Sequence, residues 1–552
     1  MSVAPETLPE VALRAPSDVM RLARMGSFFP TRLSFMRSMI RRLNAEQATV
    51  TRPVWEIDAH GYGRAVYSVD LGGYTYSLIA FATPLADEDR SDRVIAEAWD
   101  STYVLFDGVP TTADLDRLQG EAPRQEAGRY TARELVLSRA NKSQRLFNHV
   151  VERLRDGAQP DRAMVDSIGY LMRTTAVYGN GKFGIADRDR IADRAGLGGP
   201  FQAEMLTVWL IRGFTCDLVE HVGGSTIDPD IRRHFGIGNS TGLGMAPFLV
   251  THPILLNAWM LARETAFARV LAAPVSPDAA AVFTALLPRA IAHIDAWNVE
   301  DTRQMPRIET LRSELAELSA EAAMLLTKGW PALVEWSGAK SLEMQELLVA
   351  LMLEPHGDLV DGLTDCMATD REPRLDPTMR CDSFKSLVED VFGWALAVDF
   401  AAKEETRRFW YVSEEKLEPR LGDRYTEEGA DREQPLDIAR QAQALHAALV
   451  AADGNETTAT LLMRRPDLRM IAKRVQSAPF YPYAEIQDNL IGAGCLPIDM
   501  LRCKLSFFGA TKFDPKSDLW TRVTLFQGAP GFEDICAKDA DDWSFPVLAG
   551  VR

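Results

Sequence analysis

Three of the eight histidines in this 552-residue chain lie within 32 residues of one another, at His221, His234 and His252. An even distribution would place roughly 0.5 histidine in a span of that length. Asp217 precedes His221 by four residues, so on a helix the two side chains would share a face and could pair. Imidazole titrates near neutral pH, and histidine is therefore the most frequent general acid or base. The cluster indicates acid/base catalysis.

The two outer histidines occupy predicted helix ends of opposite electrostatic character. His221 falls in the last turn of a helix expected over 201–224, where the helix dipole and Asp217 both favour the charged imidazolium. His252 follows Thr251, a typical N-cap, and a helix N-terminus favours the neutral ring. Two histidines whose pKa values are pushed apart suit an acid/base pair. We therefore expect Asp217 to orient His221 as the acid, and His252 to act as the base, with His234 beside them.

A glycine-rich stretch, GIGNSTGLG at 236–244, lies between these histidines. Its backbone N–H groups and its amide and hydroxyl side chains could bind a carboxylate or phosphate, which nearby arginines could hold in a bidentate manner. A second stretch, AVYGNGKFG at 176–184, lacks the spacing of a Walker loop but could form an anion-binding turn. The expected substrate-binding residues are Arg232, Arg233, Gly238, Asn239, Ser240, Thr241, Arg173 and Lys182.

The alternative for the glycine-rich stretch is a structural joint, in which glycines only let the chain turn between two packed helices. The length of the expected connection, 223–250, favours a site, because long loops inside compact domains are usually functional or disordered.

Motifs for metals and cofactors do not occur in the sequence. There is no G-x-S-x-G, H-E-x-x-H or strand-linked G-x-G-x-x-G pattern. His293 and Asp295 have the spacing of a metal triad, but residues two apart on the expected helix do not share a face. No metal is therefore expected and no cofactor is identified, although the aromatic C-terminal region leaves open a cofactor-dependent oxidoreductase.

The secondary structure that would position these residues is mainly helical. Alternating residues around Gly72-Gly73 predict a β-hairpin over 64–83, with flanking strands at 54–57 and 101–108. Alternation around 520–526 predicts a further strand. Apolar residues at helical spacing predict helices over 131–157, 201–224, 251–274, 278–297, 307–330, 341–363, 384–409 and 435–454.

The expected fold class is α+β and predominantly α. A large helical core would carry a small antiparallel sheet near the N-terminus, which the C-terminal segment could join. We expect a helix and small sheet in 1–130, the helical core with the site in 131–410, a charged loop or lid in 411–436, and a helix with a mixed segment packed on the core in 437–552.

Composition narrows the classes of partner. A net charge of −17 and a pI of about 5.1 disfavour nucleic acid. The six cysteines form no C-x-x-C pair, which fits reduced thiols. The N-terminal residues lack the pattern of a secretion signal, and no apolar run is long enough for a membrane span. We therefore expect a soluble, cytoplasmic protein, and the excess of arginine over lysine is typical of a GC-rich bacterium. A homo-oligomer remains open.

A basic stretch at 21–43 contains six arginines and no acid. Its second half has Leu33, Met36, Ile40 and Leu43 at helical spacing, which predicts an amphipathic helix. Its arginines either pair with acids elsewhere or form a docking face for an anionic ligand, membrane surface or partner. The arginines are Arg21, Arg24, Arg32, Arg37, Arg41 and Arg42.

Together these features predict a cytoplasmic enzyme of small-molecule metabolism that performs acid/base chemistry on a small anionic organic substrate, by elimination, isomerisation or group transfer. The alternative is a non-enzymatic helical scaffold or adaptor that binds through 21–43, with the charged segment 413–435 regulating access.

Overall fold

The computed structural model describes most of the chain. The described residues are 12–29, 31–89, 98–122, 131–174, 194, 196–197, 200–241, 253–297, 302–364, 375–399, 409–412, 419–422, 432–486, 497–509, 512–514, 521–543, 545, 548 and 550.

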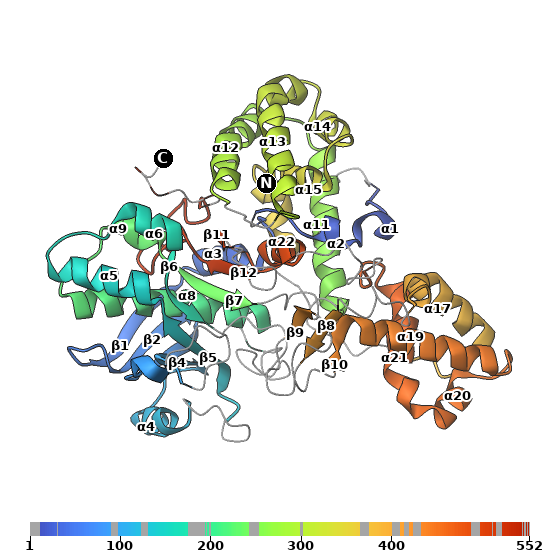
Figure 1. Cartoon of the computed structure of the whole chain (residues 1–552), viewed down its shortest axis with the longest axis horizontal. Helices are drawn as coiled ribbons and strands as arrows, with labels where there is room; N and C mark the ends of the chain where they lie inside the picture. The colour runs from blue at the N-terminus through green and yellow to red at the C-terminus, as the bar shows by residue number, and fades with distance from the viewer. Residues whose placement is uncertain are drawn as a thin grey trace, which may run out of the picture.

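The central feature is a nine-stranded mixed sheet (Figure 1). Its pairs are antiparallel except β6–β7, which is parallel. The sheet is therefore larger than the small N-terminal sheet we expected, and it draws on segments on both sides of residue 130. In spatial order its strands are β1 (Thr49–Ile57), β2 (Gly63–Leu71), β3 (Tyr74–Ala82), β4 (Ser101–Asp107), β5 (Glu134–Lys142), β6 (Tyr170–Thr174), β7 (Gly236–Thr241), β12 (Thr521–Leu525) and β11 (Lys512–Asp514).

The predicted hairpin and its flanking strands are confirmed. Strands β2 and β3 pair up to Leu71 and Tyr74, with Gly72 and Gly73 between them at φ of 61° and 86°. A two-residue hairpin turn of this kind requires two positive φ values, which glycine adopts without strain. The strand expected around 520–526 is also confirmed as β12, and it joins the sheet beside β7.

The predicted helix over 131–157 is partly wrong. Its first half is strand β5, which pairs with β4 on one side and β6 on the other, and only Gln144–Arg155 is helical (α5). Leu135, Val136 and Ala140 of the strand are buried. Strand pairing on both edges outweighs the modest helix propensity of the stretch.

The expected long loop at 223–250 is also wrong where the structure describes it. The chain forms helix α9 (Pro229–His234) and then strand β7, which consists of the residues GIGNST. A side chain at Gly236 would place its Cβ 2.4 Å from the carbonyl oxygen of Leu525, and one at Gly238 would meet the ring of Tyr170 at 2.7 Å. These glycines therefore allow close pairing within the sheet, which sequence composition alone does not distinguish from a loop.

The charged segment expected as a loop at 413–435 is partly strand. Strands β8 (Phe409–Val412), β9 (Pro419–Gly422) and β10 (Arg432–Glu433) form a three-stranded antiparallel sheet. Helix α19 begins at Gln434, and the remaining residues of the segment, 413–418 and 423–431, lie outside the described residues.

The helices form three groups, one on the large sheet and two that lie above it and to its right in Figure 1. Helix α8 (Pro200–Gly223) packs along one face, and α4 (Thr112–Glu121) covers a small apolar cluster that includes Val104 and Phe106. A second group is α11 (Pro253–Ala272), α12 (Pro277–Asp295), α13 (Met305–Leu326), α14 (Trp330–Ser337) and α15 (Leu342–Leu353). A third group is α17 (Cys381–Leu396), α19 (Gln434–Ala451), α20 (Thr458–Arg464) and α21 (Arg469–Ser477).

The N-terminal segment lies between the sheet and the second helical group. It contains α1 (Pro16–Val19), α2 (Leu22–Met25) and α3 (Phe35–Ala45). Helix α2 packs on α15 and on α22 (Pro497–Phe507), whereas α3 packs on α8. The amphipathic helix predicted in 21–43 is confirmed as α3, and its predicted apolar residues are buried in the main core.

Within the part of the chain that the structure describes, no helix combines the length and the apolar character that crossing a bilayer would need.

Candidate functional site

The predicted acid, His221, lies at the exposed end of α8. Its Nε2 is 2.9 Å from the backbone oxygen of Asp58, and its ring packs edge-on against Trp55. Asp217, four residues earlier, is bound by other groups and does not orient this ring. It accepts hydrogen bonds from Arg52 at 2.9 Å, Arg232 at 2.5 Å and the hydroxyl of Tyr67 at 2.5 Å.

The network around Asp217 changes the titration of Tyr67. Burial, followed by the adjacent Asp217 carboxylate, raises the pKa of the Tyr67 hydroxyl well above its ordinary value. The phenol therefore stays protonated and donates its hydrogen bond to Asp217. This arrangement connects β2 to α8. The carboxylate of Asp217 is used by hydrogen bonds to Arg52, Tyr67 and Arg232.

His234 lies in a different environment. It is buried in α9, where its Nε2 is 2.8 Å from the side-chain nitrogen of Gln527 and 3.2 Å from Asp166. Its neighbour Arg233 donates to the backbone oxygen of Gly528 at 2.7 Å. These contacts attach the C-terminal segment to α9.

Among the described residues, the predicted catalytic side chains have different partners. His221 and His234 have separate partners, and Arg232 and Arg233 bind Asp217 and Gly528. His252 and Lys182 lie outside the described residues.

Other predicted binding residues do come together. Arg173 of β6 pairs in register with Gly238 of β7, at the carboxyl end of the parallel strand pair. Asn239 is fully buried and donates to the backbone oxygen of Thr174 at 3.1 Å. Strand β7 continues through Ser240 and Thr241, whose side chains are outside the described part of the molecule.

Asn239 also binds a residue that sequence reasoning missed. The ammonium of Lys504, on α22, donates to the Asn239 side-chain oxygen, and Lys504 is only 3% exposed. Buried lysines are rare, and the carboxyl ends of parallel strands are frequent ligand-binding positions. The signal in the sequence was a lysine within MLRCKLSFF (500–508), a mainly apolar stretch in which Arg502 is the other charged residue.

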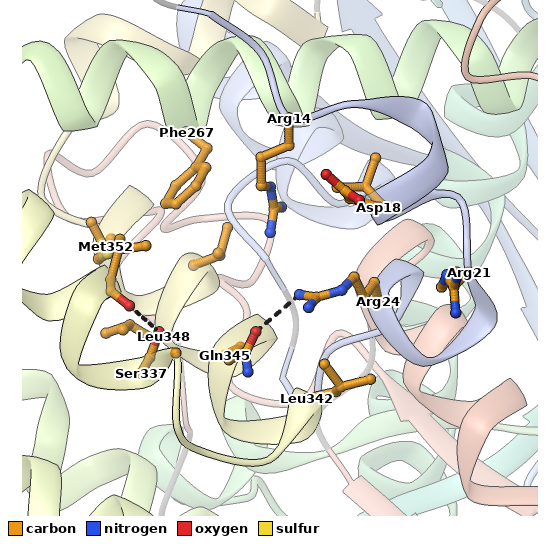
Figure 2. A pocket seen from close by; sticks show the side chains of 14 residues that line it. Arg14, Asp18, Arg21, Arg24, Phe267, Ser337, Leu342, Gln345, Leu348 and Met352 are labelled. Atoms are coloured by element: carbon orange, nitrogen blue, oxygen red, sulfur yellow. Dashed lines mark hydrogen bonds between the residues drawn. The ribbon is translucent and has the colours of Figure 1, made fainter.

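A cavity lies elsewhere, between the N-terminal segment and helices α11, α14 and α15. Its volume is about 420 Å³, which is within the range of small-molecule sites. We call it the arginine pocket. Figure 2 shows Arg14 and Arg24 entering it from the N-terminal segment, with Leu348 and Met352 of α15 on the other side.

Two buried carboxylates hold the arginines of this pocket in place. Arg14 binds Glu264 through two hydrogen bonds of 2.7 and 2.8 Å, and its guanidinium lies 4.8 Å from the ring centre of Phe267. Arg24 donates to Gln345 at 3.0 Å and to Glu346 at 3.1 Å. The side chains of Glu264 and Glu346 are fully buried. The guanidinium groups are therefore fixed before any ligand arrives.

The pocket retains positive charge. A third guanidinium, that of Arg263, contacts Glu346 and donates to the backbone oxygen of Arg24 at 2.8 Å. Asp18 and Arg21 also line the cavity, so four guanidinium groups face three carboxylates, those of Asp18, Glu264 and Glu346. Burial, and then the neighbouring Arg14, lower the pKa of Arg24. An additional negative charge would relieve this imbalance.

The opposite side of the pocket is apolar. Nearly every side chain of α15 is buried, and its second half, 347–353, is apolar on all sides, as expected for a core helix. Its Leu348, Val349 and Met352 line the cavity with Val334 of α14 and Phe267 of α11. The arrangement suits a ligand with an anionic group and an apolar body.

Sequence analysis found only part of this site. It identified Arg21 and Arg24 within the basic stretch, but it missed Arg14 and the acids Glu264 and Glu346. The available signal was an acid inside each of two strongly apolar helices, at WMLARETAF and MQELLVALML. Buried acids in such helices require a cationic partner.

Within the described ranges, no group of three His, Cys, Asp or Glu side chains could hold a metal ion. The described cysteines that are free include Cys216, Cys381, Cys503 and Cys536.

Comparison with known proteins gave no match to a family model, a curated protein or a solved structure.

Proposed function

We propose that this protein binds a small organic molecule with an anionic group and an apolar body in the arginine pocket. One observation carries the proposal: four guanidinium groups face three carboxylates beside a cavity whose other wall is apolar. The sequence-based expectation of a small anionic ligand is kept, but the binding position moves from 212–253 to the N-terminal segment.

The contacts within the pocket favour an oxyanion as the charged group. Arg14 and Arg24 are held by Glu264, Gln345 and Glu346, so they lose little conformational entropy on binding. Guanidinium groups form strong, directional hydrogen bonds with carboxylates and phosphates. The apolar body of the ligand would lie against Leu348 and Met352.

Calorimetric titration with decanoate tests this proposal, since decanoate combines a carboxylate with an apolar chain. The wild-type protein should bind decanoate more tightly than acetate or decyltrimethylammonium. Arg24→Gln should weaken binding by removing a cation, whereas Val334→Trp should block the cavity without changing its charge. Arg465→Gln is the matched control, because Arg465 is exposed at the C-terminal end of α20 and pairs with Asp467. Equal binding of decanoate and decyltrimethylammonium would refute the proposal.

A second candidate function is the acid/base enzyme expected from the sequence. The observation that favours it is Lys504, a buried ammonium held by Asn239 at the carboxyl end of β6 and β7. Buried lysines serve as bases or nucleophiles when their surroundings favour the neutral amine.

Incubation with a mixture of small organic acids, followed by mass spectrometry, tests the enzymatic proposal. The wild type should deplete at least one acid, and Lys504→Met should not, although both have the same circular dichroism. If both proteins deplete the same acid, Lys504 is not part of the mechanism. If neither protein depletes any acid, the proposal that the protein is an enzyme acting on these acids is contradicted.

A further inference from the structure

A second cavity lies between α3 and the C-terminal segment, away from the arginine pocket. Its volume is about 440 Å³, and residues on its wall include Arg41, Arg42, Asp361, Lys538 and Asp541. It therefore combines the C-terminal half of the basic stretch with charged residues from two distant parts of the chain.

Two acids in the wall already have strong arginine partners. Asp361 accepts hydrogen bonds of 2.6 and 2.7 Å from Arg32. Asp541 accepts two hydrogen bonds of 3.0 Å from Arg37, which also binds Glu354 at 2.5 Å. These acids are committed to residues behind the cavity wall.

Arg41 is left with weak contacts to the same acids. Its Nη1 is 3.4 Å from Asp541 and its Nε is 3.6 Å from Asp361, both longer than a good charge-assisted hydrogen bond. Within the described chain, the buried Nη2 of Arg41 and the buried Nε of Arg42 have no hydrogen-bond partner. Burial, the largest effect, lowers the pKa of Arg41. A buried guanidinium nitrogen without an acceptor is costly, so an acceptor is expected.

The charged side chains around the cavity also have a net positive charge, which favours binding of an anion. Arg32, Arg37 and Arg41 are balanced by Glu354, Asp361 and Asp541. The remaining charges in the wall are those of Arg42 and Lys538 against Glu46, which leaves one positive charge. Lys538 is exposed and lies where it could meet an incoming ligand.

We propose that this cavity binds a small molecule with two or more oxyanion groups, whose oxygens accept hydrogen bonds from Arg41 Nη2 and Arg42 Nε. The unpaired nitrogens of Arg41 and Arg42 are two separate donors, and the cavity is larger than one oxyanion. Both features favour a ligand with several oxyanion groups over a single phosphate. The site is distinct from the arginine pocket and would allow the protein to bind two different anions.

Titration with pyrophosphate and citrate at constant ionic strength tests the proposal, with inorganic phosphate as the single-oxyanion arm. Pyrophosphate or citrate should bind the wild-type protein more tightly than phosphate. Arg42→Gln should weaken that binding roughly tenfold, and Lys538→Gln, at an exposed position that should not affect folding, should weaken it by a smaller factor. Arg465→Gln should leave it unchanged.

The two anion sites can be tested independently. Arg24→Gln should keep pyrophosphate binding, and Arg42→Gln should keep decanoate binding, so failure of one proposal does not imply failure of the other. The proposal is overturned if neither pyrophosphate nor citrate binds, if phosphate binds as tightly as both, or if Arg42→Gln and Lys538→Gln together leave binding unchanged.

Discussion

The arginine pocket and the middle of helix α8 both contain buried or half-buried arginines, but the partners of those arginines differ. Within α8, Arg212 is buried and donates hydrogen bonds of 2.6 to 2.9 Å to the backbone oxygens of Phe235, Arg233, Ala529 and Pro530. In the pocket, Arg14 and Arg24 bind carboxylates and border a cavity. An arginine surrounded by backbone carbonyls fixes the fold, whereas one held by acids at the edge of a cavity can still meet a ligand.

The largest expected effect follows from this distinction. Arg212→Met would remove a donor from four backbone oxygens, of which those of Arg233 and Pro530 keep Gly528 and Trp209 as donors. The change should lower the free energy of unfolding by about 4 kcal/mol. Urea denaturation measures the change. Arg212→Lys, which keeps the charge but not the planar fork, should recover only part of the loss. A loss below about 1 kcal/mol would show that these carbonyls are satisfied in another way.

Arg24→Gln should instead affect binding more than folding. Glu346 keeps Arg14 and Arg263 as partners, so unfolding should change less than for Arg212→Met. Decanoate affinity should fall by about 2 kcal/mol, or roughly thirtyfold, the usual value of a hydrogen bond to a charged group. Calorimetry and urea denaturation on the same variant give both numbers. If Arg24→Gln lowers the free energy of unfolding but leaves the affinity for decanoate unchanged, the distinction between the arginines of the pocket and Arg212 is wrong.

Alkaline pH should weaken the α8 region through Tyr67. Burial and Asp217 raise the pKa of this hydroxyl, so the folded state holds its proton more tightly than the unfolded chain. The resulting stabilisation is complete below the ordinary tyrosine pKa of about 10 and is lost as pH rises beyond it.

The measurement is unfolding as a function of pH for the wild type and Tyr67→Phe. The wild type should lose stability more steeply above about pH 10, because the variant has no hydroxyl to titrate at that position. Burial also raises the pKa of Tyr76, to about 12, so the slope of the variant should be smaller but not zero. Identical slopes would mean that Tyr67 titrates normally.

The smallest effect is expected at His221. Its ring is exposed and contacts one backbone oxygen, so His221→Ala should cost about 0.5 kcal/mol of stability and leave decanoate binding intact. His234→Ala is the matched comparison, and it should cost more because His234 is buried against Gln527. If His221→Ala abolished a reaction of this protein, the α8 region would have to be reconsidered as a catalytic site.

Local features of the fold were accessible from the sequence. Gly72-Gly73 between alternating strands predicted the hairpin, and apolar spacing around Met36 and Ile40 predicted α3. Strand β5 was missed because its partners β4 and β6 lie elsewhere in the chain, and pairing decided its conformation. Strand β7 was missed because Gly236 and Gly238 read as loop residues, although they allow close contact with Leu525 and Tyr170.

The candidate site was less accessible because it depends on distant contacts. Arg24 stood out in a basic stretch, but its partners Gln345 and Glu346 lie more than 300 residues away. Nothing near Arg14 indicates that Glu264 will bind it. In the sequence, the clustered histidines stood out more than these arginines and acids did. In the folded protein, however, His221 of α8 and His234 of α9 contact different residues.

The position of β12 bears on how the chain is synthesised. This strand completes the edge of β7, but it is translated 280 residues after β7 ends at Thr241. Until it emerges from the ribosome, the N–H and C=O groups on that edge have no strand to pair with, and an open edge can recruit another nascent chain. Closing so long a loop also slows the final step of folding. Such a protein would benefit from a chaperone that shields the unfinished sheet during translation.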